Sequence, residues 1–408
     1  MSDTMRPRPA GGGVLPRSSP ALRFVLLIGV VSLFADMTYE GARSITGPYL
    51  AVLGASATAV GVVAGGGELL GYALRLVSGR LSDLTRGYWP IALAGYVVQM
   101  AAVPALALAG SWQAAAFLIV LERVGKGMRN PPRDAMLAHA STQMGRGWAF
   151  GLHEALDQLG ALIGPLAAAL VLAVRGQYQV AFAVLLIPAV LTLGFLAVAR
   201  ISYPDPGNLA ARPADVRTGG LPRELWLYLG AVMLVAAGFA DFSLMAFHFQ
   251  RADTVPPDWI PLFYAAAMGI SGLGSLVFGR LFDRAGIVVL VPLTLATAAF
   301  APLAFLGAPP EAFIGTLLWG LGMGVHESIM AAAVANMVPP GRIASAYGLF
   351  NLLYGLAWFL GSAAMGLLYD VSLPALAGFS VLAELLAIPL ILAVARAGRG
   401  TRTASTLG

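Results

Sequence analysis

The chain has 408 residues, of which 58% are hydrophobic and only 11% are charged, and its formal net charge is +5. A soluble domain carries about 25% charged residues because its surface faces water. This composition excludes a soluble enzyme and indicates a protein whose surface faces a lipid bilayer. The chain has no cysteine, and its four histidines show no metal-ligand spacing, so we expect no disulfide, no metal site and no cofactor.

The predicted elements are twelve helices that cross the membrane. Such a helix needs about 20 mostly apolar residues, and turn-forming residues such as Pro204-Asp205-Pro206 and Pro339-Pro340-Gly341 separate the apolar stretches. In chain order the predicted spans are 22–40, 56–77, 88–109, 112–137, 147–173, 178–199, 225–248, 260–279, 287–307, 311–336, 343–368 and 373–395. We therefore expect an all-α integral membrane protein.

The positions of the arginines predict the orientation in the membrane. Cytoplasmic loops of membrane proteins carry an excess of Lys and Arg. If both termini are cytoplasmic, most arginines of this chain lie on the cytoplasmic side, and Arg43, Arg175 and Arg251 lie outside. Topology then explains the net charge, so we expect no nucleic-acid partner. We expect a multi-pass protein of a bacterial inner membrane with both termini in the cytoplasm.

The two halves of the chain repeat each other. Phe34-Ala35-Asp36 in the first span recurs as Phe239-Ala240-Asp241 in the seventh, about 200 residues later. Repeated halves are typical of transporters that bind their substrate between the halves, near the middle of the membrane. Because one chain contains both halves, we expect a monomer. The predicted parts are a disordered cytoplasmic tail (1–21), a six-helix bundle (22–200), a cytoplasmic linker (201–223), a second six-helix bundle (224–395) and a cytoplasmic tail (396–408).

A short motif follows the second span and recurs after the eighth. The copies are Gly79-Arg80-Leu81-Ser82-Asp83-Leu84-Thr85-Arg86-Gly87 and Gly279-Arg280-Leu281-Phe282-Asp283-Arg284-Ala285-Gly286. Both resemble the cytoplasmic signature G-x-L-a-D-r-x-G-r of the major facilitator superfamily. The resemblance implies the fold of that family, two pseudo-symmetric six-helix bundles, and a gate that the aspartates close by accepting hydrogen bonds. The alternative is that these are simple turn residues. The implied gate residues are Gly79, Asp83, Arg86, Gly279, Asp283 and Arg284.

The fifth span contains Gly151, Gly160, Gly164 and Pro165. Their spacing resembles the antiporter signature of drug–proton exchangers, G-x8-G-x3-G-P-x2-G-G, with Ala168-Ala169 in place of the final two glycines. The resemblance implies export in exchange for protons. Small residues four apart also let a second helix pack closely, so ordinary helix packing is the alternative interpretation.

The fourth span contains Arg123-Val124-Gly125-Lys126-Gly127. This segment resembles the pattern R-x-x-q-G that is associated with proton coupling in exporters, with Lys126 in place of the glutamine. Arg123 therefore occupies the position of the arginine in that pattern.

Ionisable residues within the predicted spans are concentrated in the first half. Each costs several kcal/mol at bilayer depth, so we expect them to face a cavity. Asp36 lies ~20 Å along its helix from Arg23, at a depth where an unpaired carboxylate is a candidate proton carrier. Glu68 and Glu154 are rival candidates, and Arg123 is expected to stabilise the carboxylate in one conformation only. The alternative is a static salt-bridge network, especially for the residues whose helical spacing supplies partners, namely Glu122, Lys126, Arg129 and Asp157.

Polar, aromatic and methionine residues of both halves form the candidate substrate cavity. An aromatic and Met-rich wall with a few polar groups suits an amphipathic organic ligand, although packing against lipid explains most of these aromatic residues equally well. Arg75, near the end of the second span, is expected to extend to the cytoplasmic interface. The candidate cavity residues are Glu40, Lys126, Asp157, Asp241, Met245, His248, Trp319, His326 and Glu327.

We therefore expect a secondary active transporter that exports a small organic compound in exchange for protons. One alternative is proton-coupled import, or facilitated passage, of a polar metabolite. Another is export of a divalent metal ion through Asp241, His248, His326 and Glu327, and a third is a membrane receptor that transports nothing. The chain has no ATP-binding loop, so transport driven directly by ATP is not expected.

Overall fold

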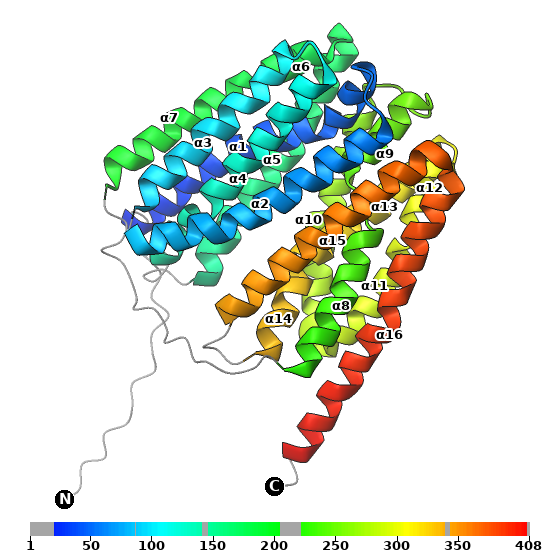
Figure 1. The fold of residues 1–408 in the computed structure, drawn as a ribbon. Helices are drawn as coiled ribbons and strands as arrows, with labels where there is room; N and C mark the ends of the chain where they lie inside the picture. Colours follow the sequence, from blue (N-terminus) through cyan, green and yellow to red (C-terminus); the bar gives the residue numbers. More distant parts are fainter. Residues whose placement is uncertain (1–19, 86, 141–145, 205–221, 339–342, 406–408) are drawn as a thin grey trace, which may run out of the picture.

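The computed structural model describes residues 20–85, 87–140, 146–204, 222–338 and 343–405, and all regular structure in these ranges is helical (Figure 1). The helices of the first half are α1 (Pro20–Val52), α2 (Ala57–Thr85), α3 (Tyr88–Ala105), the short turn η1 (Leu106–Leu108), α4 (Trp112–Ala140), α5 (Arg146–Arg175), α6 (Tyr178–Val184) and α7 (Leu186–Ser202). Those of the second half are α8 (Arg223–Gly238), α9 (Phe242–Arg251), α10 (Ile260–Ala285), η4 (Gly286–Val289), α11 (Leu290–Thr297), α12 (Phe300–Leu306), α13 (Pro309–Val325), η5 (His326–Met330), α14 (Ala331–Met337), α15 (Ile343–Val371) and α16 (Leu373–Ser405).

Nine helical stretches in the described part of the chain are long and apolar enough to cross a membrane. One of them, Ile260–Leu306, has 47 residues. Its 47 residues correspond to ~70 Å of helix, enough for two crossings, and the turn η4 separates α10 from α11 and α12. α4 is not among the nine because it carries many charged side chains, and α13 has only 17 residues before the turn η5. With these taken into account, the helices are consistent with the twelve predicted spans.

The pairing of helices repeats between the two halves. In the first half α1 packs against α5 and α7, α2 packs against α4, and α3 packs against α4 and α7. In the second half α8 packs against α15 and α16, α10 packs against α13, and α12 packs against α13 and α16. Corresponding spans therefore have corresponding neighbours, as expected of two pseudo-symmetric six-helix bundles.

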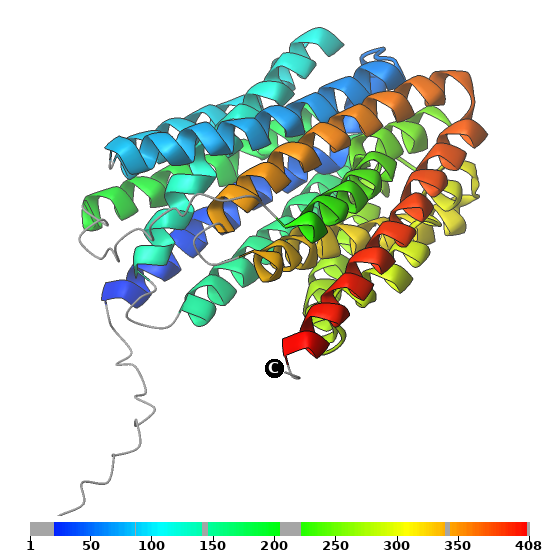
Figure 2. The same ribbon diagram turned by 60° about the horizontal axis from the view of Figure 1, so that its bottom comes forward.

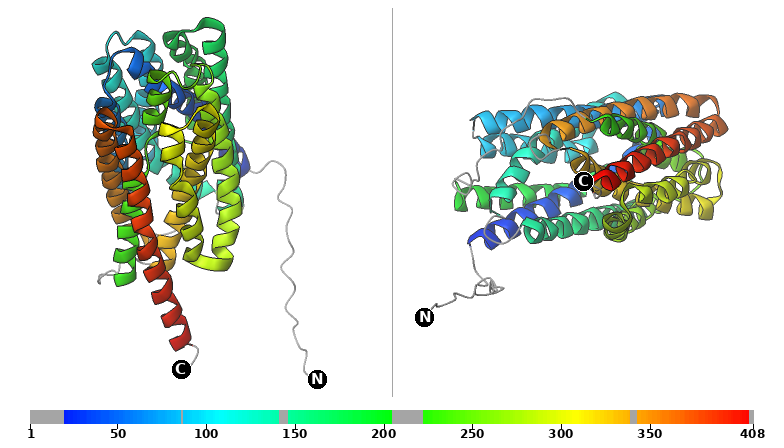
Figure 3. Two further views of the ribbon diagram at one scale, coloured as in Figure 1. Left: turned by 90° about the vertical axis from the view of Figure 1, so that its right-hand side faces the viewer. Right: turned by 90° about the horizontal axis from the view of Figure 1, so that it is seen from below.

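The helices run between two ends of the molecule. We call one the Pro20 end, where α1 begins, at the left of Figure 1, and where α16 finishes, at the bottom. Figure 3 shows α16 projecting beyond its neighbours at this end. We call the opposite end the Val52 end, where α1 turns into α2 and where α6, α9 and α12 lie in Figure 1.

The two halves are in close contact at the Val52 end, where α1 packs against α9 and α2 runs beside α15 (Figure 2). Glycines allow this approach, since a side chain at Gly47 would collide with the backbone of Ser243, and one at Gly61 with the backbone of α15. At the same end, Thr58 Oγ1 donates a hydrogen bond to Asp370 Oδ2 at 2.7 Å. These contacts close the Val52 end.

Two of the interrupted spans in the second half carry an ionisable residue at the break. Between α8 and α9 the residues 239–241 leave the helix, and Asp241 Oδ1 accepts a hydrogen bond of 2.9 Å from the backbone N–H of Ser243. Asp241 therefore caps α9. The other interruption is the π-helical turn η5, which begins at His326. Interruptions of both kinds are frequent at functional sites.

Candidate functional site

A cavity of about 440 Å³ lies between the two halves. Its lining residues from the first half are Asp36, Tyr39, Glu40, Arg43, Glu68, Tyr72, Arg75, Lys126, Arg129, Asn130, Arg133, Asp134, Glu154, Asp157, Gln158 and Ala161. Those from the second half are Met268, Ser271, Met323, His326, Phe350, Asn351, Tyr354 and Trp358. These residues come from the middle of their helices and from the parts that continue toward the Pro20 end. The cavity therefore lies away from the closed Val52 end, and the carboxylate, lysine and arginine groups among its described residues all come from the first half.

Arg129 of α4 is fully buried and holds together the centre of the polar network. It donates hydrogen bonds to Asp36 Oδ1 of α1 at 3.2 Å, to Gln99 Oε1 at 2.5 Å and to the hydroxyl of Tyr96 at 3.1 Å. A buried guanidinium needs such partners because an uncompensated charge is costly. Asp36 is thus ion-paired in this conformation, and Arg129 finds its partners on other helices, whereas helical spacing predicted them on α4 itself.

A second charged cluster joins α4 to α5 toward the Pro20 end. Arg133 lies 2.9 Å from Asp134 Oδ1 and 3.9 Å from Asp157 Oδ2. On α5, His153 Nδ1 lies 3.6 Å from the same oxygen of Asp157, across one helical turn. The predicted cavity residue Asp157 therefore lines the cavity as part of an ion-pair cluster.

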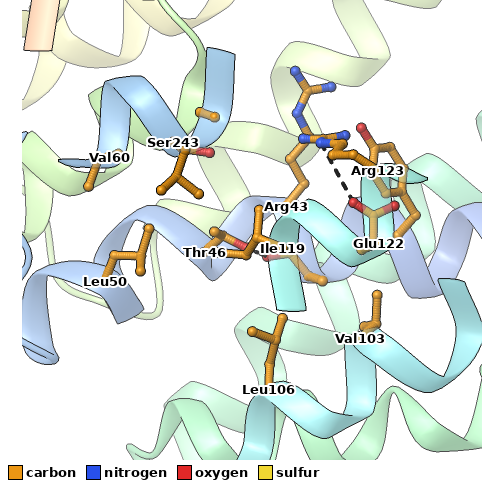
Figure 4. A pocket seen from close by; sticks show the side chains of 14 residues that line it. Arg43, Thr46, Leu50, Val60, Val103, Leu106, Ile119, Glu122, Arg123 and Ser243 are labelled. Atoms are coloured by element: carbon orange, nitrogen blue, oxygen red, sulfur yellow. Dashed lines mark hydrogen bonds and ion pairs between the residues drawn. The ribbon is translucent and has the colours of Figure 1, made fainter. Parts of the chain in front are cut away.

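Arg123 lies beside the cavity, at a smaller pocket of about 20 Å³ that is enough for a water molecule (Figure 4). Its guanidinium lies 3.1 Å from Glu68 Oε1 and 3.6 Å from Glu122 Oε2. Glu122 also accepts a hydrogen bond of 2.7 Å from the side chain of Gln99. Glu68 lines the cavity, so its carboxylate links Arg123 to the cavity.

Arg43 and Asp241 form an ion pair that joins the two halves. Arg43 NH2 lies 3.2 Å from Asp241 Oδ2, and the two side chains are 7% and 0% exposed. Arg43 lines both the cavity and the smaller pocket, where Figure 4 shows it close to Arg123. The pair therefore connects the cavity wall to the break between α8 and α9.

Lys126 projects onto the ring of Tyr39, with Nζ 3.5 Å from the ring centroid. This is a close cation–π contact. Among the side chains that the structure describes, no carboxylate lies within 4.0 Å of this ammonium group. The neighbouring carboxyl of Glu40 is buried and accepts a hydrogen bond from the hydroxyl of Tyr264 on α10. Tyr39 and Glu40 thus lie where α1 meets both α4 and the second half.

The second half contributes an aromatic wall, which we define as Phe350, Tyr354 and Trp358. These residues are four apart on α15 and line one side of the cavity. Neighbouring rings have centroids 5.7 Å and 5.6 Å apart. The hydroxyl of Tyr354 lies 3.1 Å from Nδ1 of His326, the first residue of η5. The wall is apolar with a few polar groups, as expected of an organic-ligand site.

The structure brings together the cavity residues Glu40, Lys126, Asp157 and His326 that the sequence predicted. Of the predicted proton-coupling residues, Asp36, Glu68 and Glu154 line the cavity and Arg123 lies beside it. Glu154 is exposed and accepts a hydrogen bond from Gln158 at 3.0 Å. Their roles in transport stay predictions.

Four predicted cavity residues of the second half are buried and do not line this cavity. Asp241 caps α9 and Met245 is fully buried. His248 Nδ1 lies 3.1 Å from the hydroxyl of Tyr369, and the indole N–H of Trp319 donates to a backbone carbonyl in the break before α9. The sequence places them in predicted spans, but a pattern along one helix does not say which neighbour covers each side chain.

The side chain of Glu327 lies outside the described residues. Among the side chains that are described, no three acidic or histidine groups are close enough to hold a metal ion. No observation therefore favours the metal-export hypothesis.

In the first copy of the gate motif, Gly79 packs against α4. A Cβ atom at this position would lie 3.4 Å from Cβ of Pro131. The side chain of Asp83 and the whole of Arg86 lie outside the described residues, so the gate contact stays a prediction.

In the second copy of the motif, Gly279 faces open space. Asp283 and Arg284 are both exposed. These three residues therefore do not form a packed gate contact in the present conformation, whereas Phe282 of the same copy is buried in the core.

Gly160 and Gly164 let α5 lie directly on α1. A Cβ atom at either position would collide with a backbone carbonyl of α1. Gly151 faces open space, and Pro165 lies within α5. Close packing is thus sufficient to explain two of the three glycines in the antiporter-like motif, and its link to export stays a prediction.

Several residues of the site were not identified from the sequence. Tyr39 and Tyr264 contact Lys126 and Glu40, and no motif indicates this. Arg75 lines the cavity, with its guanidinium 4.8 Å over the ring of Tyr72, whereas we expected it at the membrane interface. The aromatic wall could have been recognised from the sequence, because its rings recur every four residues and therefore lie on one face of the helix.

The chain belongs to the major facilitator superfamily of membrane transporters, whose family model matches residues 26–362. A protein of Mycobacterium tuberculosis, described as uncharacterized, is 42% identical over 381 residues that cover 92% of this chain and 93% of that protein. An uncharacterized MFS-type transporter of Methanocaldococcus jannaschii is 27% identical over 85% of this chain and 89% of its own length. Among solved structures, a nucleoside transporter has a TM-score of 0.71 at 12% identity, over 91% of this chain and 98% of that chain, a likeness of fold.

The comparisons and the helical structure confirm the predicted fold class and the prediction that the chain is a transporter and not an enzyme. They do not specify the drug-exporter branch.

Proposed function

We propose that this transporter exports a small organic compound in exchange for protons. The observation that carries the proposal is the cavity between the halves, which has ionisable groups on one wall and aromatic rings on the other. A site between two repeated halves is what alternating access requires.

The closed Val52 end supports a conformation that is open toward the Pro20 end. We propose that the Pro20 end is cytoplasmic, because the exposed Arg23, Arg80, Arg280 and Arg284 lie there and positive charge favours the cytoplasmic side. The cavity then receives its ligand from the cytoplasm. Separation of α1 from α9 and of α2 from α15 would open the other side.

The ion pair of Asp36 with Arg129 supports a proton-coupling role for Asp36. A carboxylate next to a guanidinium is favoured in its charged form, whereas the same group without that partner in a bilayer is favoured in its neutral form. A change of conformation that separates the two side chains would therefore remove the charge partner of Asp36, which is the kind of change that proton coupling requires. Glu68 and Arg123, 3.1 Å apart, form a second pair to which the same argument applies.

One observation favours a second candidate function, proton-coupled import of a polar metabolite. The cavity wall from the first half carries eleven carboxylate, lysine and arginine side chains, more than an apolar drug needs. The two functions differ in the direction in which protons and substrate move.

The test uses inside-out membrane vesicles that contain the full-length protein. Respiration acidifies the interior of these vesicles. Compounds are added outside, at the cytoplasmic face, and the interior pH is followed with a fluorescent dye. When a transported compound enters the vesicles, the protein should move protons outward, and the interior pH should rise. Asp36→Asn should abolish this response, and Glu311→Gln, which neutralises an exposed carboxylate at the start of α13, should retain it.

A compound that enters the vesicles without moving protons would contradict proton coupling. Proton movement in the same direction as the compound would favour the import function. An unchanged response in Asp36→Asn would assign the proton to another carboxylate.

A further inference from the structure

Among the side chains that the structure describes, charge pairing around the cavity leaves Lys126 without an ion-pair partner within 4.0 Å. The neighbouring arginine–carboxylate pairs are Arg43–Asp241, Arg123–Glu68, Arg129–Asp36 and Arg133–Asp134. Lys126 has the ring of Tyr39 instead, and within the described part of the chain no carboxylate oxygen comes within 4.0 Å of it. An ammonium group is a compact charge with three hydrogen-bond donors on a flexible side chain, which suits reversible binding of an anion.

The carboxylates of the cavity are less open to a cationic ligand. A cation at Asp36 or Glu68 would have to displace an arginine and leave a buried guanidinium uncompensated, which is strongly unfavourable. Glu40 already accepts a hydrogen bond from Tyr264, and the exposed Glu154 accepts one from Gln158. The charge on Lys126 also repels a cation.

Hydrogen-bond donors without partners also favour an anionic ligand over a cationic one. Within the described residues, the Nε–H of Arg43, the Nε–H of Arg75 and the indole N–H of Trp358 are buried and unpartnered, and all three residues line the cavity. Unpartnered acceptors remain on Asn130 and Asp157. Because burial of an unsatisfied donor is unfavourable, a ligand with several acceptor oxygens suits this cavity.

We propose that the transported compound is an organic oxyanion, with its carboxylate or phosphate at Lys126 and a flat apolar body against the aromatic wall. Phe350, Tyr354 and Trp358 are the rings on which the body would stack, and Met323 beside them adapts to its outline. The inference rests on the proposed function only in that the cavity holds the transported compound. It does not depend on the direction of transport or on protons.

The sole lysine of the chain makes a direct test possible. Reductive methylation with carbon-13 formaldehyde adds two methyl groups to the ammonium and keeps its charge. The purified protein then gives one NMR signal from Lys126 and a separate one from the N-terminal amine. The probes are aryl and alkyl carboxylates and phosphates of increasing size, each matched with its neutral amide or alcohol and with an ammonium analogue.

We expect aryl oxyanions to shift the Lys126 signal in a saturable way, and their neutral and cationic counterparts to leave it unchanged. Failure of every oxyanion to shift the signal would overturn the proposal. Equal or tighter binding of the neutral or cationic counterparts, measured by thermal stabilisation, would overturn it as well.

Variants provide a second, independent measurement. Lys126→Gln should weaken binding of the oxyanion by about tenfold or more and leave the binding of its neutral counterpart unchanged. Lys126→Arg should retain most of the affinity. Arg175→Gln, which removes a positive charge from the exposed end of α5, should have no effect.

Failure of this inference is distinguishable from failure of the proposed function. An oxyanion that binds at Lys126 but does not cross the membrane of proteoliposomes would contradict the transport proposal alone. A neutral or cationic compound that is transported, with no competition from oxyanions, would contradict the oxyanion inference alone.

Discussion

At the scale of single residues, the ion pair between Arg43 and Asp241 is a buried charged contact between the halves. Removal of one member of a buried pair leaves the other uncompensated and costs about 3 kcal/mol or more. Asp241→Asn keeps a side-chain oxygen that accepts from Ser243, so the cap of α9 is retained while the charge is lost. We expect this variant to lower the thermal unfolding temperature markedly in detergent.

The matched control is the double variant Arg43→Gln with Asp241→Asn. Because it leaves no charge unpaired, it should recover a large part of the lost stability. Equal stability of the single and double variants would show that the two charges are not energetically coupled. Packing of the side chains would then explain the contact.

The partners of individual charged residues could be predicted only in part. The pair of His153 and Asp157 follows from helical spacing, because residues four apart share a face. The same rule fails for Arg129, whose ion-pair partner is 93 positions away on α1. Contacts between helices depend on packing angles and depths that a pattern along one helix does not contain.

At the scale of helices, close packing of α1 on α5 depends on Gly164. An added methyl group there would collide with a carbonyl of α1, and such overpacking costs about 1–3 kcal/mol. Gly194 of α7 faces open space, so the same change is tolerated and gains helix propensity of up to about 1 kcal/mol. We expect Gly164→Ala to unfold at a lower temperature than the parent protein, and Gly194→Ala at an equal or higher one. Equal effects of the two substitutions would contradict this account of the packing.

The spans themselves were predictable, because the length of an apolar stretch is dictated by the thickness of the bilayer. The predicted span 373–395 lies within α16, and the predicted span 56–77 begins one residue before α2. The interruptions were not predictable in the same way. The break before α9 lies inside an apolar run, and it is held by Asp241 through contacts with a distant part of the chain.

At the scale of the whole molecule, the contact between Thr58 and Asp370 gives a test of alternating access. The chain has no cysteine, so the double variant Thr58→Cys with Asp370→Cys carries the only two thiols. A disulfide or a short thiol cross-linker should join them and hold the Val52 end closed. We expect cross-linking to abolish transport while ligand binding from the Pro20 end persists, and a reducing agent to restore transport. The single-cysteine variants are the controls, and full transport by the cross-linked protein would show that this end need not open.

The double role of Asp241 has a consequence for the balance between conformations. One of its oxygens accepts a hydrogen bond at the start of α9, and the other pairs with Arg43 of the opposite half. The contact between the halves and the start of α9 therefore depend on the same side chain. Any motion that parts the halves here must expose a guanidinium whose only described carboxylate partner is this one. The empty transporter should therefore populate the arrangement seen here far more than its opposite. A substrate would then drive the cycle by supplying, at the moment of separation, an acceptor to the arginine that Asp241 releases.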